Sequence, residues 1–349
     1  MNTLTRGEKM ERPNIIKIVG LSLLVFCLFI PSINGAEKRF SIKIATLAPE
    51  GSSWMKTFKA LTDEVMKKTE NNVQFKIYPG GILGDERDML RKMRIGQIHA
   101  AALTAGGLGV LFTDIDVLQI PFLFQNYGEV DYLLTKMDTY FKTAIENNGY
   151  ILLGWTEAGF IYLMSNTPIS RVSDLKKVKV WIWEDSPMSK AIFNEAGVAA
   201  IPLSIPDVLI GLQTGLVDVV YTPPTGAIAL QWFTKIKYIT NVPLVYIVGG
   251  IVIKKDIFKK LPQPSQNIIL ESCQRHLAQS KTVTRNENQE ALKVMEKHGV
   301  KIISPSKDHI DEFKMLWDRA KDRLGTQCFS KKVFDEVSSH LEHYRKGGK

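Results

Sequence analysis

Residues 41–66 read SIKIATLAPEGSSWMKTFKALTDEVM, and their pattern indicates the fold class. It begins with alternating apolar and polar side chains, the two-residue period of a β-strand with one buried face. After the turn Ala48–Gly51, Ser52 and Ser53 are natural helix caps, and apolar residues then recur at helical spacing. A strand, a turn and an amphipathic helix in this order are typical of a sheet covered by helices.

The same order of elements repeats further along the chain. Residues 73–78 predict a second strand, the turn Pro79–Gly81 leads into a helix that Gly96 ends, and residues 99–103 predict a third strand. A second series of strands and helices begins near Gly159. We therefore predict an α/β protein of two domains, each with a mixed sheet flanked by helices.

A long helix is predicted over residues 264–298, which contain no proline or glycine after Pro264 and have helical apolar spacing. At about 1.5 Å per residue this helix would be about 52 Å long, more than the width of one domain. We expect it to span both domains. The predicted boundaries are 37–159 plus 247–285 for the first domain, and 160–246 plus 286–349 for the second.

The start of the chain is typical of an export signal. Basic residues precede an uncharged, largely apolar run of 13 residues, Ile18–Ile30, which Pro31 and small residues close. A membrane-spanning helix needs about 20 apolar residues, so the run favours a removable signal peptide over residues 1–36, cleaved after Gly35 or Ala36. An uncleaved anchor is the alternative. Either way, we expect the folded part to lie outside the cytoplasmic membrane, in the periplasm.

The composition argues against a nucleic-acid partner. The formal net charge is +9, and the leader holds four basic and two acidic residues, so 9 − 2 = +7 remains without it. Basic and acidic residues are mixed, as in 85–92, and form no basic block with interleaved aromatics. Cys273 and Cys328 remain; they either form a disulfide or are two buried thiols, since spacing does not give geometry.

Four strings occur in a specific order: GILGDER at 81–87 leading to IGQI at 95–98, IPFLF at 120–124, PI with DLK in 168–176, and LQTGLVD at 212–218. Their order and spacing resemble the substrate-binding proteins of tripartite ATP-independent periplasmic (TRAP) transporters, the DctP family. The resemblance implies a periplasmic binding protein of the Venus-flytrap type, with a ligand cleft between two domains that close on binding. It also implies a small-molecule ligand, no cofactor, and delivery to TRAP membrane permease subunits or a periplasmic tetratricopeptide partner.

The chain departs from this family where relatives bind carboxylates. Those relatives use an arginine, because a guanidinium can hold a carboxylate by two hydrogen bonds, and the resemblance places Trp181 at that position. A second family arginine falls on Ile161, a family asparagine on Thr222 and an acidic position on Thr104. A carboxylate desolvated there would lack a fixed cation. We therefore expect an atypical member without the carboxylate-binding arginines, and a neutral or largely apolar ligand.

Aromatic and aliphatic side chains take the place of those polar groups. A rival prediction is a cationic or zwitterionic ligand held by the tryptophans, with Glu157 or Glu184 as counter-charge. Each large apolar residue could instead pack in the core, which is the usual place for such side chains. The expected ligand-binding residues are Trp181, Trp183, Ile161, Phe160, Tyr221, Thr222, Ile205, Thr104 and Trp54.

The competing class, an exported hydrolase, has no motif in this sequence. There is no Gly-x-Ser-x-Gly elbow and no His-Glu-x-x-His. The glycines at 106, 107 and 109 lack the Lys-Ser/Thr ending of a phosphate loop. His340 and His343 share a helix face but have no evident third ligand. We predict a binding protein rather than an enzyme, with no metal and no cofactor.

Overall fold

The first of two sheets has five strands in the order β2-β1-β3-β10-β4. β1 pairs in parallel with β2 and β3, whereas β10 pairs antiparallel with β3 and β4, so this sheet is mixed. The computed structural model describes residues 39–183, 186–324 and 327–348, and the predicted signal peptide and its cleavage point lie outside them. The strands are β1 (Phe40–Thr46), β2 (Val73–Tyr78), β3 (Ala100–Thr104), β4 (Tyr150–Phe160) and β10 (Tyr246–Lys254).

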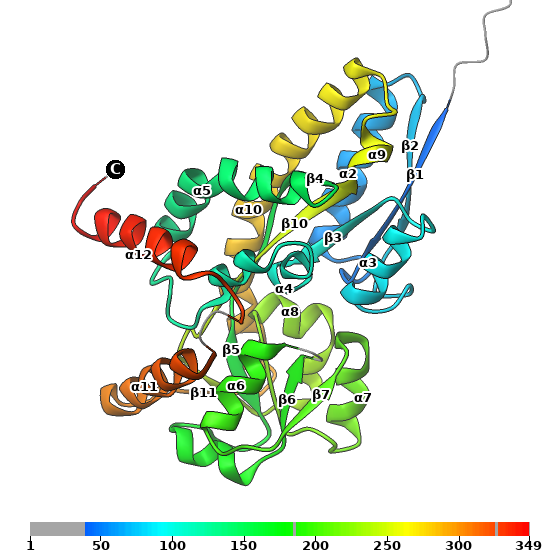
Figure 1. The fold of residues 1–349 in the computed structure, drawn as a ribbon. Coiled ribbons are helices and arrows are strands. Elements are labelled where there is room, and N and C mark those ends of the chain that lie inside the picture. The colour runs from blue at the N-terminus through cyan, green and yellow to red at the C-terminus, as the bar shows by residue number, and fades with distance from the viewer. Residues whose placement is uncertain (1–38, 184–185, 325–326, 349) are drawn as a thin grey trace, which may run out of the picture. The chain divides into compact units, whose positions relative to one another are not determined.

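Helices cover both faces of this sheet, and together they form what we call the first domain (Figure 1). The helix predicted after the opening strand is α2, and the Ser52 side chain caps it by accepting a hydrogen bond from the Met55 amide at 3.3 Å. The helical elements are α2 (Ser53–Lys68), α3 (Glu86–Arg94), α4 (Ala105–Gly109), η1 (Thr113–Gln119), α5 (Tyr127–Asn147), α9 (Lys255–Phe258) and α12 (Lys331–Arg345).

The second sheet has six strands in the order β11-β9-β5-β8-β6-β7, and with its helices it forms the second domain. β6 is parallel to β7 and β8, and β5 is antiparallel to β8 and β9. Its strands are β5 (Tyr162–Ser165), β6 (Val180–Trp183), β7 (Ala200–Leu203), β8 (Val219–Thr222), β9 (Tyr238–Thr240) and β11 (Lys301–Ile303). Its helical elements are η2 (Val172–Lys177), α6 (Pro187–Glu195), η3 (Ile205–Asp207), α7 (Val208–Gln213), α8 (Pro224–Ala229), η4 (Trp232–Lys235) and α11 (Lys307–Leu324).

The predicted long helix is α10 (Gln263–Lys297), within one residue of the expected bounds. It packs on α2 and β4 of the first domain and on α8 of the second, as Figure 1 shows. The chain also passes directly from β4 of one sheet to β5 of the other at Ile161, and returns from β9 to β10. The α/β fold, with two mixed sheets flanked by helices and one helix along both, is confirmed.

Gly159 lies in this crossing and needs to be a glycine. Its φ is +110°, and a Cβ atom there would collide with the side-chain amide of Asn288 on α10. That amide donates to the carbonyl of Ala158 at 2.8 Å, and its oxygen accepts from the Thr225 amide of α8 at 3.0 Å. Asn288 therefore ties the crossing strand and the second domain to the same helix.

The C-terminal helix differs from the predicted domain boundary, which put residues 286–349 in the second domain. α12 packs against α5, and its Val333, Val337 and Leu341 are fully buried in the core of the first domain. Val333, Val337 and Leu341 repeat at helical spacing and so form one apolar stripe, which binds the helix to α5. We therefore propose to assign α12 to the first domain.

Cys273 and Cys328 are both free, buried thiols, which settles the alternative between a disulfide and two thiols. They lie in separate hydrophobic clusters: Cys273 is a buried residue of α10, and Cys328 lies just before α12. Within the described residues, no helix is long and apolar enough to cross a membrane.

Candidate functional site

A cavity of about 740 Å³ is lined by both domains. The first domain contributes the start of α3, the glycine-rich α4 and η1, and the second contributes Ile161, the end of β6, α6 and Tyr221. α11 and the strand that returns to β10 complete the wall. A volume of this size is in the range of small-molecule sites, which are commonly apolar clefts with a few placed polar groups.

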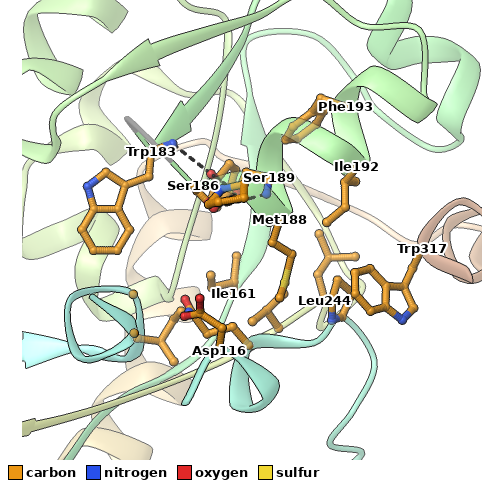
Figure 2. Close-up of a pocket in the computed structure, with 18 of the residues that line it drawn as sticks. Asp116, Ile161, Trp183, Ser186, Met188, Ser189, Ile192, Phe193, Leu244 and Trp317 are labelled. Carbon is orange, nitrogen blue, oxygen red and sulfur yellow. Dashed lines mark hydrogen bonds between the residues drawn. The ribbon is translucent and has the colours of Figure 1, made fainter. Parts of the chain in front are cut away.

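The apolar wall comes mainly from α6 and α11 (Figure 2). α6 begins at Pro187 because the Ser186 side chain caps it, accepting from the Ser189 amide at 3.2 Å. Successive turns of α6 then place their side chains toward the cavity. The described apolar residues that line the cavity are Val110, Pro121, Phe122, Ile161, Leu163, Leu175, Pro187, Met188, Ile192, Phe193, Leu244, Val245, Ile247, Phe313, Leu316 and Trp317.

Asp116 of η1 forms part of the polar end of the cavity. Figure 2 shows its carboxylate on the opposite side of the cavity from α6. The Gln119 side chain donates to its Oδ1 at 2.8 Å. A Cβ atom at Gly109 would collide with the same oxygen, so this glycine makes room for the carboxylate. Burial raises the pKa of Asp116 to about 7, against the opposing charge of Arg87.

Glu86 also lies at this end but is bound within the first domain. Its carboxylate accepts from the Thr104 amide at 2.7 Å and from the Thr104 hydroxyl at 2.9 Å, and the Gly107 amide adds a third bond. Burial raises the pKa of Glu86 to about 8, while the Thr104 amide opposes the shift. Thr104, predicted to bind ligand, instead anchors Glu86 at the start of α4 and is not among the lining residues.

Asp85 connects the two domains. It caps α3 by accepting from the Glu86 amide at 2.7 Å. Its other oxygen accepts from the Trp183 indole N–H at 2.8 Å and from the Ile205 amide at 3.3 Å, both in the second domain. A Cβ atom at Gly106 would be only 2.7 Å from the Trp183 ring, so the indole lies directly against the first domain.

Three of the nine predicted residues line the cavity: Ile161, Trp183 and Tyr221. The Tyr221 hydroxyl accepts from the Trp183 amide at 3.1 Å and lies 3.1 Å from the Ser189 hydroxyl. Ile205 contributes its backbone amide to Asp85 and does not line the cavity. Tyr221 and Trp183 therefore belong to one hydrogen-bonded group at the junction of β6, β8 and α6.

Trp181, given the largest role in the prediction, lies in the core of the second domain. Its side chain is 3% exposed, it donates to the carbonyl of Leu203 at 3.0 Å, and its ring contacts those of Tyr221 and Trp232. It is not among the residues that line the cavity. We therefore exclude Trp181 from the proposed site.

Three further predicted residues also lie away from the cavity lining. Phe160 packs against the rings of Tyr127 and Tyr246, Thr222 is buried at the end of β8, and Trp54 is in the first turn of α2. We exclude these three from the proposed site as well.

Glu157, expected as a counter-charge for a cationic ligand, is already paired. It accepts two hydrogen bonds from Arg285 of α10, at 2.8 and 3.0 Å, and one from the Tyr246 hydroxyl. Asp131 holds the other edge of the same guanidinium. This buried network joins α10 to β4 and α5 away from the cavity. Glu184, the other expected counter-charge, lies outside the described residues.

Most of the lining was not predicted from the sequence. The string 81–87, which is part of the family resemblance, contains the lining residues Asp85, Glu86 and Arg87. The resemblance points to this segment but does not predict that these side chains line the cavity. Asp116 and Gln119 lie in no sequence motif that would indicate a binding role. In the part of the chain that the structure covers, no group of three or more His, Cys, Asp or Glu side chains is placed to hold a metal ion.

Comparison with known proteins places this geometry in a family. Over 248 residues the chain is 25% identical to the 2,3-diketo-L-gulonate-binding periplasmic protein YiaO of Escherichia coli, covering 70% of this chain and 75% of YiaO. It is 24% identical over 288 residues to the C4-dicarboxylate-binding periplasmic protein DctP of Rhodobacter capsulatus, covering 81% and 84%.

Solved structures show the same fold. The sugar acid binding protein DctPAm of Advenella mimigardefordensis, in complex with galactonate, superposes with a TM-score of 0.82 at 20% identity, covering 87% of this chain and 98% of that one. A TRAP periplasmic solute-binding protein of Xanthobacter autotrophicus with bound β-D-galacturonate gives a TM-score of 0.80 at 19% identity, covering 86% and 99%. The family model for bacterial extracellular solute-binding protein, family 7 (DctP), matches residues 44–324, and the chain therefore belongs to that family.

Proposed function

We propose that this chain, a TRAP-type solute-binding protein, captures an organic acid with one carboxylate and an apolar body, and delivers it to membrane permease subunits. The observation that carries the proposal is the charge of the cavity wall. Among the described lining residues the wall has one basic side chain, Arg87, beside an extensive apolar surface. One guanidinium matches one carboxylate, and the apolar surface matches a hydrocarbon or ring.

The relatives support an acid as the ligand class. YiaO and DctP are named for acids, and the two solved structures contain galactonate and galacturonate. A wholly neutral or apolar ligand finds no support among them, and neither does a tetratricopeptide partner. The binding role agrees with a family of transport proteins rather than enzymes.

We also infer that the two family arginines are absent, with Ile161 and Trp181 at their positions. Ile161 lines the cavity as an apolar residue, and Trp181 is in the core of the second domain. The cation that balances a carboxylate then comes from elsewhere in the wall, and Arg87 on the first turn of α3 is placed for that role. This arrangement would differ from relatives that hold their acid from the second domain.

Binding would be coupled to closure. A ligand in this cavity touches both domains, so it stabilises the closed arrangement by its difference in affinity for the two forms. The hinge would lie at the crossing near Gly159, beside α10. We expect the radius of gyration in solution to contract when the true ligand is added.

A cationic ligand is the second candidate, because four carboxyl groups are among the described residues that line the cavity: Asp85, Glu86, Asp88 and Asp116. Asp85 and Glu86 already accept hydrogen bonds within the protein, and Asp88 pairs with Arg91 at 2.8 Å. Of these four described groups, Asp116 is the one with capacity for a ligand, and a single carboxylate is too little for a multiply charged cation such as a polyamine.

The test is a thermal-shift and calorimetric screen with three panels: monocarboxylates with apolar bodies, dicarboxylates, and quaternary amines. We expect the first panel to bind, and Arg87→Gln to weaken it by about three- to tenfold, since part of the guanidinium stays exposed. Arg94→Gln, on the exposed end of the same helix, is the matched control and should change nothing. Binding by the amines alone would refute the proposal.

A further inference from the structure

We infer that Asp116 is a specificity-determining residue, which accepts a hydrogen bond from a hydroxyl or ammonium group of the bound acid. The ligand class is then a hydroxy or amino monocarboxylate with an apolar body. This inference rests on the proposed function and deepens it. It concerns the group that the acid must carry besides its carboxylate.

Asp116 has unused hydrogen-bonding capacity. A carboxylate has about four lone-pair sites. Within the described residues, Asp116 accepts one hydrogen bond, from Gln119 to Oδ1, while Glu86 accepts three. Asp116 also lines the cavity, where Figure 2 shows it directed into the open space. A ligand group that donates would complete its bonding, whereas a methylene would leave the carboxylate desolvated and unpaired.

The protein holds the carboxylate of Asp116 in position. Gln119 fixes the orientation of Oδ1 through its bond of 2.8 Å. Gly109 leaves the space that Oδ1 occupies, since any side chain there would displace it. Gln119 is thus a positioning residue, and Gly109 sets where the carboxylate can lie.

The charged groups around Asp116 agree with a donor as its partner. Arg87 faces it from α3, and the thiol of Cys328 faces it from the segment after α11. Burial, and then the Asp116 charge, raise the pKa of that thiol to about 11, so the thiol stays neutral. The pKa of Asp116 itself is raised to about 7 by burial. A donor bound to the ionised form therefore gains affinity as the pH rises through 7, and an ammonium group gains more than a hydroxyl.

The experiment uses sets of three matched acids that differ at one carbon, which carries hydrogen, hydroxyl or ammonium. One such set is 4-methylpentanoate, 2-hydroxy-4-methylpentanoate and leucine, and further sets vary the apolar body and the position of the substituent. Calorimetry at pH 6 and pH 8 gives each affinity. In at least one set we expect a donor-bearing acid to bind about ten- to a hundredfold tighter than its unsubstituted partner.

Two variants locate the effect. Asp116→Asn keeps the shape but removes the charge, and it should reduce the preference to about threefold or less and abolish its rise with pH. Gly109→Ala keeps the carboxylate but displaces it, and it should reduce the preference as well. Asp311→Asn, the same change on the exposed face of α11, is the control and should leave both affinities unchanged.

The outcomes separate this inference from the proposed function. If unsubstituted acids bind as tightly as their donor-bearing partners, or if Asp116→Asn keeps the preference and its pH dependence, the inference is wrong and the proposed function stands. If no monocarboxylate of any set binds while the control variant is folded, the proposed function fails and this inference fails with it.

Discussion

The hydrogen bond from Trp183 to Asp85 allows a direct test of how the two domains are held together around a ligand. It joins the indole N–H of the second domain to a carboxylate of the first at 2.8 Å. A hydrogen bond to a charged group contributes about 1.5–3 kcal/mol. Asp85→Asn keeps an acceptor but loses the charge. A neutral hydrogen bond is about half as strong as one to a charged group, so this variant should lose about 1 kcal/mol of the contribution of the bond. Trp183→Phe removes the donor.

The assay is a double-mutant cycle on ligand affinity, measured by calorimetry with the tightest acid from the screen. We expect each single variant to weaken binding by about fivefold or more, and the double variant to be weakened by less than the product. The difference between the summed effects of the single variants and the effect of the double variant is the coupling free energy, which we expect to be about 1 kcal/mol. Additive effects, within about 0.5 kcal/mol, would refute the reasoning, because they would mean that the bond contributes no more to the ligand-bound form than to the free form.

The chain holds a matched control of the same chemistry. Trp155 donates from its indole N–H to Asp138 at 2.8 Å, and both residues lie in the first domain. The cycle of Trp155→Phe and Asp138→Asn should show coupling in the free energy of unfolding but none in ligand affinity. This contrast separates a bond across the cleft from an ordinary stabilising bond.

Three further predictions concern stability and are read from urea unfolding. Arg285→Met leaves the buried carboxylate of Glu157 without its cation, and we expect a loss of about 3 kcal/mol, against less than about 1 kcal/mol for Lys293→Met in an exposed pair. Gly159→Ala, at a φ of +110° and against Asn288, should cost about 1–3 kcal/mol; an unchanged stability would mean that the crossing can relax. Glu64 accepts hydrogen bonds from Lys68, Arg275 and His276, which lower its pKa from 4.5 to about 2. Since a lowered carboxyl pKa adds stability above the unfolded value, that part is lost as the pH falls from 4.5 to about 2, and Glu64→Gln should flatten the profile only in this window.

The fold could be predicted from the sequence because its signals are local. The alternation in 41–47 and the capped helix after it depend on a few neighbouring residues, and both occur as β1 and α2. The length of α10 follows from the absence of proline and glycine after Pro264. The position of α12 could not be predicted from the sequence. Its apolar stripe indicates that one face of the helix is buried, but not against which domain it packs.

The site was less predictable because cavity walls and cores use the same side chains. Trp181 and Trp183 point to the same face of β6, as their alternation predicts. Trp183 is the last residue of that strand, and in α/β sheets ligands bind beyond the carboxyl ends of strands. Trp181 is two residues earlier, about 6.6 Å deeper, where Trp232 covers it. Phe313, Leu316 and Trp317 likewise have the spacing of an ordinary core helix.

The two ends of the cavity belong to different domains, and this division links recognition to closure. The charged groups Arg87 and Asp116 are on the first domain, whereas the apolar side chains of α6 are on the second. An acid without an apolar body would bind only to the charged groups of the first domain. A hydrocarbon would contact only the apolar side chains of the second domain. Neither would gain much by bringing the domains together, since a ligand favours the closed form only by its extra contacts there. If the ligand has both parts, as we propose, it makes its full set of contacts only in the closed form. The arrangement that selects this ligand would then also couple its recognition to closure.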